Sequence, residues 1–178
     1  KNIFSASVNN DGIIQAGRIE NIGGEIRLIG TDTVIHSGII NVNGVGTTST
    51  GGSVQVLGNK TGLFDEAEVL ASGEAGGGEV LIGGDYQGKN PNIQNSEFTY
   101  VSEGSSINAD ALVEGDGGKV ILWADDSTQY YGDISAKGGE FSGDGGFVET
   151  SGKSNLISGG SVDASSNTGE AGTWLLDP

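Results

Sequence analysis

A pair of small residues followed by alternating apolar residues recurs six times, and this repeat constrains the fold more than any other feature of the chain. One copy reads Gly-Gly-Glu-Ile-Arg-Leu and another reads Gly-Gly-Lys-Val-Ile-Leu. The six copies occupy residues 23–28, 51–56, 77–82, 117–122, 145–150 and 171–176. They begin about 27 residues apart, except that the fourth begins 40 residues after the third. A period of this length predicts a chain built by stacking one structural unit.

Two further columns of apolar residues follow the same period. In one, a β-branched residue is followed two positions later by a small one, which places both on one face of a strand. The β-branched members are Ile40, Val69, Ile107, Ile134 and Val162. A weaker column lies six residues earlier, at Val34, Leu63, Val101, Thr128 and Leu156. Each repeat therefore offers three short strands separated by turns.

The three strands per repeat favour an all-β fold, a right-handed parallel β-helix (solenoid) of about six coils that forms a single domain over residues 1–178. Helices are disfavoured because 34 of the 178 residues are glycine, and each glycine costs a helix about 1 kcal/mol. No tight Asn-Gly connection brings neighbouring strands back antiparallel. We expect the first apolar residues after the glycine pairs to form a buried ladder, Ile26, Val54, Val80, Val120 and Val148. We expect the glycines to serve corners where φ is positive.

The single long step predicts one inserted loop at about residues 85–97. Its sequence is polar and contains Pro91, so we expect it to project from the coil as a surface segment that can be replaced.

Charge and composition limit the classes of partner that the chain can bind. The chain carries 24 acidic and 8 basic residues, a formal net charge of −16. Such a surface repels phosphate backbones and anionic lipid, which argues against nucleic acid and membrane surfaces as partners. No apolar run is long enough to span a bilayer, so we expect no membrane insertion. The first residues lack the apolar core of a signal peptide, and the absence of cysteine excludes disulfides.

Four stretches resemble the filamentous haemagglutinin-like exoproteins of bacterial two-partner secretion. They are residues 82–89, 115–125, 143–153 and 172–178, and the resemblance extends over roughly residues 51–178. It implies a right-handed β-helix, export through an outer-membrane secretion partner, and adhesion or biofilm roles outside the cell or at the bacterial surface. The chain is then expected to be a segment of a longer exoprotein.

The chain departs from this family in one motif. The Asn-Pro-Asn-Gly signature of the secretion domain is missing, since Asn90-Pro91-Asn92 is followed by Ile93. We therefore interpret the chain as stalk that lies beyond the secretion domain.

Motifs for catalysis, metals and cofactors are absent or weak. His36, the only histidine, has no nucleophile context, and we expect it to be exposed or at a corner. Asp116 and Asp144 precede glycine pairs, but their spacing does not match tandem calcium-binding repeats, so we interpret them as solvated turn residues. The few basic residues form no cluster with carboxylates of the kind that polysaccharide cleavage needs. We expect no enzyme, no cofactor and no metal.

Side chains of the types that commonly contact sugars are the remaining indication of a recognition site. The candidates are Tyr86, Gln87, Lys89, Asn92 and Trp123. Trp123 follows an inward-facing leucine and should face outward, where it either binds a host or matrix glycan or packs beneath the inserted loop. Packing is favoured, because exposed tryptophan usually finds cover. Asn59-Lys60-Thr61 is an N-glycosylation sequon whose use stays open.

The ends of the predicted rod show no cap. At the start, the β-like pattern continues through Ile13, Ile19 and Ile22; at the other end, residues Trp174, Leu175 and Leu176 begin a new coil. Uncapped coils expose strand edges and interior, so we expect self-association through the rod ends, end to end, into fibres.

Three functions follow in order of support. The first is a structural and adhesive rod that spaces binding elements outside the cell. The alternative is a carbohydrate-binding module that uses the inserted loop and Trp123. The third, which the sequence supports least, is a polysaccharide-degrading enzyme.

Overall fold

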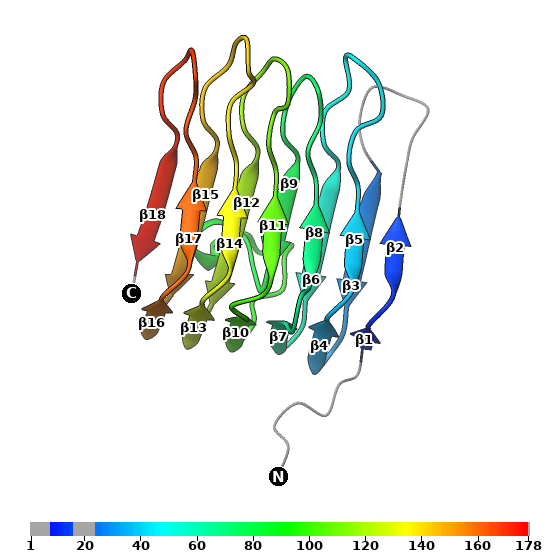
Figure 1. The fold of residues 1–178 in the computed structure, drawn as a ribbon. Coiled ribbons are helices and arrows are strands. Elements are labelled where there is room, and N and C mark those ends of the chain that lie inside the picture. The colour runs from blue at the N-terminus through cyan, green and yellow to red at the C-terminus, as the bar shows by residue number, and fades with distance from the viewer. Residues whose placement is uncertain (1–7, 16–23, 178) are drawn as a thin grey trace.

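The chain folds as a parallel β-helix in a computed structural model that describes residues 8–15 and 24–177 (Figure 1). The first sheet contains β1 (Val8–Asn10), β4 (Thr33–His36), β7 (Lys60–Leu63), β10 (Phe98–Val101), β13 (Ser127–Tyr130) and β16 (Asn155–Ser158). The second contains β2 (Ile13–Gln15), β5 (Ile39–Asn41), β8 (Glu68–Leu70), β11 (Ser106–Asn108), β14 (Asp133–Ser135) and β17 (Ser161–Asp163). The third contains β3 (Glu25–Ile29), β6 (Ser53–Leu57), β9 (Glu79–Ile82), β12 (Lys119–Ala124), β15 (Phe147–Gly152) and β18 (Thr173–Asp177).

The chain passes each of the three sheets six times, which makes about five full turns from β1 to β16. Every strand pair is parallel, and the only helix among the described residues is the short 3₁₀ turn η1 (Tyr86–Gly88). None of the described residues forms a helix long and apolar enough to cross a membrane. The prediction of an all-β parallel β-helix is confirmed. Of the apolar residues predicted near the start, Ile13 begins β2, whereas Ile19 and Ile22 lie outside the described residues.

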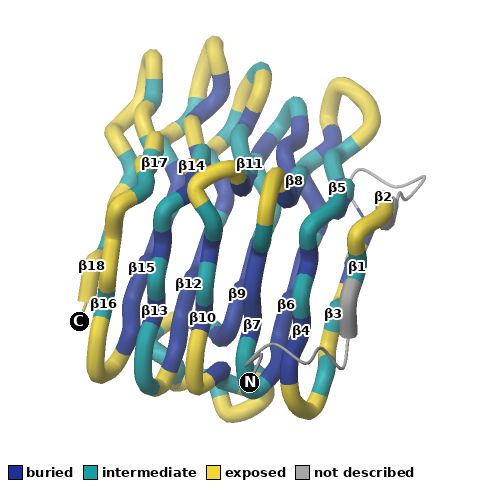
Figure 2. Tube along the Cα trace, turned by 60° about the horizontal axis from the view of Figure 1, so that its bottom comes forward, coloured by how far each residue is buried: buried dark blue, intermediate teal, exposed yellow. Residues whose placement is uncertain are grey.

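Two of the predicted interior ladders are confirmed. The register stacks Val54 on Ile26 and Val148 on Val120 in the third sheet, and Ile134 on Ile107 in the second. Figure 2 shows the buried stretch that these strands form along the rod. The core is one cluster of stacked residues that extends from Ile26 to Val148 and is aliphatic apart from Tyr130.

The predicted column that begins at Val34 is partly wrong, because some of its members are displaced by two residues along their strands. Val34 pairs with Thr61, whereas Leu63 pairs with His36 and Val101. The column therefore mixes two ladders of the first sheet. Both ladders face inward, and a shift of two residues preserves the face of a strand, so apolar patterning alone could not separate them.

His36 lies in the second of these ladders, so the expectation of an exposed or corner histidine is wrong. Its side chain is fully buried. Nδ1 lies 3.0 Å from Asn10 Nδ2, and Nε2 lies 3.4 Å from the Glu68 carbonyl oxygen. Burial lowers the pKa of His36, although the hydrogen bonds act in the opposite direction.

Within residues 24–177, the glycines of the repeated pairs do not have the positive φ that the sequence predicted. Positive φ occurs just before them, for example at Gly76 and Gly115. The pairs are needed because successive coils approach too closely for a side chain. A Cβ on Gly117 would lie 2.1 Å from the Ala136 carbonyl oxygen, and one on Gly118 would lie 2.2 Å from that of Gly78.

Candidate functional site

The segment between β9 and β10, residues 83–97, leaves the coil and folds over the outer face of the third sheet; we call it the inserted loop. Outward-facing Leu81, Ile121 and Trp123 form a second hydrophobic cluster beneath it, separate from the interior core. Ile93 of the loop and Phe147 of β15 pack against this cluster. The loop therefore covers an apolar patch that would otherwise face water.

Trp123 packs under the loop, as predicted, and is only 6% exposed. The loop backbone approaches its ring so closely that a Cβ on Gly84 or Gly88 would lie 2.7 or 2.5 Å from it. Trp123 Nε1 donates a hydrogen bond to Asp125 Oδ1 at 3.1 Å. The ring is thus an anchor for the loop and offers little surface to a sugar.

A network of charged groups fixes the start of the loop. Asp85 accepts hydrogen bonds from the Tyr86 amide, from Asn90 Nδ2 and from Lys119 Nζ, each at 2.7 Å. Lys119 also pairs with Glu79 at 3.1 Å. Partial burial acts to raise the pKa of Asp85, but these bonds outweigh it and lower the pKa. For Lys119, the two carboxylates outweigh burial and raise the pKa.

Glu149 lies beneath the same loop and was not singled out from the sequence. Its side chain is 0% exposed, and the Gln87 amide donates to both carboxylate oxygens, at 3.2 and 3.1 Å. Burial raises the pKa of Glu149, and the nearby carboxylates of Asp177 and Asp85 raise it further. Its position in the sequence indicates a buried site only weakly, because an acidic residue at an outward strand position normally faces water.

The five predicted recognition residues lie in three places. Three of them, Gln87, Lys89 and Trp123, line a hollow of about 390 Å³ at the edge of the loop. The hollow is completed by Gly88, Asp125, Lys153 and Asp177. Tyr86 instead packs edge-on against Phe147, with ring centroids 5.7 Å apart, and is 43% exposed. Asn92 is exposed on the loop and does not line the hollow.

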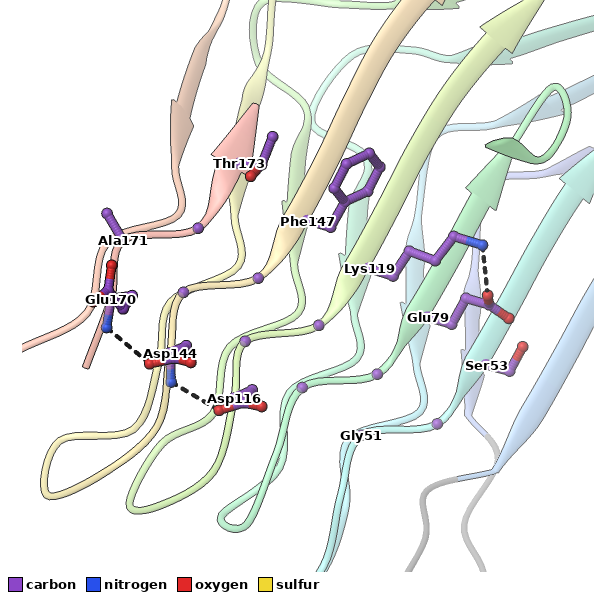
Figure 3. Close-up of a pocket in the computed structure, with 18 of the residues that line it drawn as sticks. Gly51, Ser53, Glu79, Asp116, Lys119, Asp144, Phe147, Glu170, Ala171 and Thr173 are labelled. Carbon is purple, nitrogen blue, oxygen red and sulfur yellow. Dashed lines mark hydrogen bonds and ion pairs between the residues drawn. The ribbon is translucent and has the colours of Figure 1, made fainter. Parts of the chain in front are cut away.

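A long groove of about 1140 Å³ follows the glycine pairs along the rod (Figure 3). Its side-chain walls are Glu25, Ser53, Glu79, Asp116, Lys119, Asp144, Phe147, Glu170 and Thr173. Asp116 Oδ1 accepts a hydrogen bond from the Asp144 amide, and Asp144 Oδ1 accepts one from the Glu170 amide, both at 2.8 Å. These turn aspartates therefore link neighbouring coils as well as facing solvent. The described residues contain no group of three or more side chains that could hold a metal ion.

The predicted end residues all lie in β18, but they face different ways. Trp174 and Leu176 continue the interior ladders above Val148 and Thr150, and are 36% and 45% exposed. Trp174 Nε1 donates to Thr150 Oγ1 at 3.0 Å. Leu175 pairs with Glu149 and faces outward.

Comparisons with known proteins agree with this architecture. No protein-family model matches the chain, and no curated protein matches it. Among solved structures, it is similar to the HMW1 secretion domain from Haemophilus influenzae, with 33% identity and a TM-score of 0.77 over 94% of this chain. The match covers 43% of that domain, so the chain spans less than half of its length. The predicted resemblance to two-partner secretion exoproteins is therefore confirmed by similarity to part of a secretion domain. Because the matched structure is itself a secretion domain, the comparison does not bear out the narrower interpretation that this chain lies beyond such a domain.

Proposed function

We propose that the chain is a rod segment of a secreted bacterial adhesin, whose parent chain is exported by an outer-membrane partner. The observation that carries the proposal is the likeness to a secretion domain over nearly the whole chain. The rod spaces and displays binding elements at the cell surface along an axis on which the coils stack in register. Fractionation of the native cells tests this: we expect the protein in the medium or on the surface. Recovery in the cytoplasm alone would contradict it.

We also propose that copies of the 178-residue chain associate end to end. In the last coil, β16, β17 and β18 each pair with only one strand, and Trp174 and Leu176 are partly exposed beside these free edges. Pairing these edges with a second copy and burying the apolar side chains there would favour growth of the assembly along the rod axis. The net charge of −16 opposes lateral contact between rods.

Leu176→Lys is expected to abolish this association, because it places a charge in the apolar contact. Light scattering over a concentration series measures it. Leu112→Lys is the matched control, since Leu112 is as exposed but lies in a turn away from β18. A wild-type chain that stays monomeric, or assembly that ignores Leu176→Lys, would contradict the proposal.

A second candidate function is binding of a linear glycan in the groove. Phe147 lines the groove and offers an aromatic surface suited to stacking on a sugar ring, and Tyr86 packs edge-on behind it. The acidic walls contain Lys119 as their single cation, and it is already paired with Glu79 and Asp85. We therefore propose a neutral or cationic glycan rather than a uronate or sulfated one.

A glycan array tests this candidate. We expect wild-type binding to neutral or amino-sugar polymers, and Phe147→Ala should weaken it severalfold by removing the aromatic surface that lines the groove. Tyr131→Ala is the control, because Tyr131 stacks beside Tyr100 outside the groove. Equal loss in both variants, or preferential binding of acidic glycans, would argue against the groove.

We propose binding rather than catalysis for these acidic walls. The carboxylates of Asp116 and Asp144 accept backbone amides of the next coil, and Glu79 pairs with Lys119. Carboxylates held in this way serve coil stacking rather than proton transfer. Release of products from a polysaccharide on incubation with the chain would overturn this view.

A further inference from the structure

Glu149 is a buried acid on the outer face of the third sheet, in register between two aliphatic residues. Its strand neighbours at this position are Ile121 on β12 and Leu175 on β18. The inserted loop closes over it, and the side chain has no exposed surface. An ionised carboxylate at such a place has lost its hydration and needs compensation from the protein.

That compensation is small. Among the described residues, the groups that favour the charged form of Glu149 are the Gln87 amide of the loop and the Ser151 side chain, and Glu149 takes part in no ion pair. The charged groups that act on it are Asp85 on the loop and Asp177 on β18. Lys89, Asp125 and Lys153 line the neighbouring hollow with Asp177, and Lys119 on β12 lies beside Asp85. Lys119 is occupied by Glu79 and Asp85, and both nearby aspartates repel a negative charge on Glu149.

A neutral Glu149 fits the same place better. Ser151 lies two residues further on the same face and is fully buried. Its hydroxyl is near enough to Glu149 to act to lower the pKa of that group, but its Oγ makes no hydrogen bond of normal geometry. The proton of a neutral carboxylic acid can be donated to that oxygen, while the carbonyl oxygen still accepts from the Gln87 amide. Protonation would therefore keep the contacts with the Gln87 amide and the Ser151 hydroxyl and remove the uncompensated charge.

We propose that the inserted loop is a pH-responsive cover that closes over Glu149 in acid and opens more readily when Glu149 is ionised. Opening hydrates the carboxylate and moves Asp85 of the loop away from it, so only the charged form gains from it. Opening also uncovers Leu81, Ile121 and Trp123, the apolar patch beneath the loop. The loop backbone suits such a hinge, because Gly83 and Gly88 have left-handed φ values of 77° and 61°.

The sign of the effect follows from linkage. The pKa of Glu149 is higher with the loop closed than in water, so the closed state binds the proton more tightly. Closure is therefore favoured as the pH falls toward the ordinary glutamate pKa and weakens as the pH rises through the raised pKa. Each unit of difference between the closed and open pKa changes the closed-to-open ratio up to tenfold.

Amide hydrogen exchange of the 178-residue chain tests the proposal. We expect protection of amides in residues 84–96, corrected for intrinsic exchange, to fall as the pH rises from about 5 to about 7.5. Glu149→Gln keeps the shape but cannot ionise, so it should hold protection at the acid value throughout. Glu140→Gln is the control, because Glu140 is an exposed acid in a distant turn. Acrylamide quenching of Trp123 fluorescence in a Trp174→Phe background gives a second measurement, with quenching expected to rise with pH.

Two outcomes would overturn the proposal. One is loop protection that does not change with pH in the wild-type chain, a measurement that needs no variant. The other is a pH response that survives in Glu149→Gln. His36 does not confuse the test, because its lowered pKa makes acid destabilise the coil, which is the opposite sign, and amides of β4 report it separately.

Discussion

Replacing Ile134 by alanine is expected to lower the free energy of unfolding by about 2–5 kcal/mol. Ile134 is buried in the second sheet, stacked between Ile107 and Val162. The coils above and below hold each other at the strand spacing, so the space left by the lost side chain cannot collapse easily. Urea denaturation followed by circular dichroism measures the change.

Ser135→Ala is the matched control, because Ser135 is the next residue on the same strand and faces outward. Its hydroxyl donates one hydrogen bond to Asp110 Oδ1 at 2.6 Å, which is worth about 0.5–1.5 kcal/mol. Equal losses at the two positions would refute the register of β14.

Replacing residues 86–94 by a short Gly-Ser link is expected to keep the coil but to cost it several kcal/mol. The interior core does not include the loop, so the strands should persist. The deletion uncovers Leu81, Ile121 and Trp123, and burial of such side chains contributes about 1.5–3 kcal/mol each. We expect an unchanged β-sheet spectrum, a lower melting temperature and new binding of a hydrophobic dye.

A second variant separates the two roles of the loop. If the deletion is combined with Leu81→Thr and Ile121→Thr, dye binding should fall again, because the uncovered face is then more polar. A deletion that costs no stability would show that the apolar cluster needs no cover. Loss of all β-sheet signal would show that the loop is part of the folding unit.

The sequence determined the architecture because a β-helix repeats itself. Each coil stacks on an almost identical one, so the same position must be apolar in every repeat, and this correlation is visible as a period. The ladders through Val120 and Ile134 could therefore be read from spacing alone. The break in the period also located the inserted loop, because extra residues that leave the stack do not disturb it.

The candidate site was only partly predictable, because it lies on the outer face, where each coil differs from the next. The sequence pointed to Gln87, Lys89 and Trp123, and the structure brings these three together at one hollow. It gave no way to separate Tyr86, which packs against Phe147 across the loop. Such neighbours are far apart in the chain and follow no period.

Other features were decided by the tertiary structure alone. Strand alternation says that Glu149 faces outward, but only the loop folded over it makes that position buried. The same alternation allows a shift of two residues, so packing between coils decided that His36 rather than Val34 lies beside Leu63. The glycine pairs owe their identity to the distance between coils, as at Gly117, and not to their own φ. The sequence by itself thus determined what is repeated, and the contacts between coils and with the loop decided what is particular, because a local pattern records the face of a strand and not what covers it.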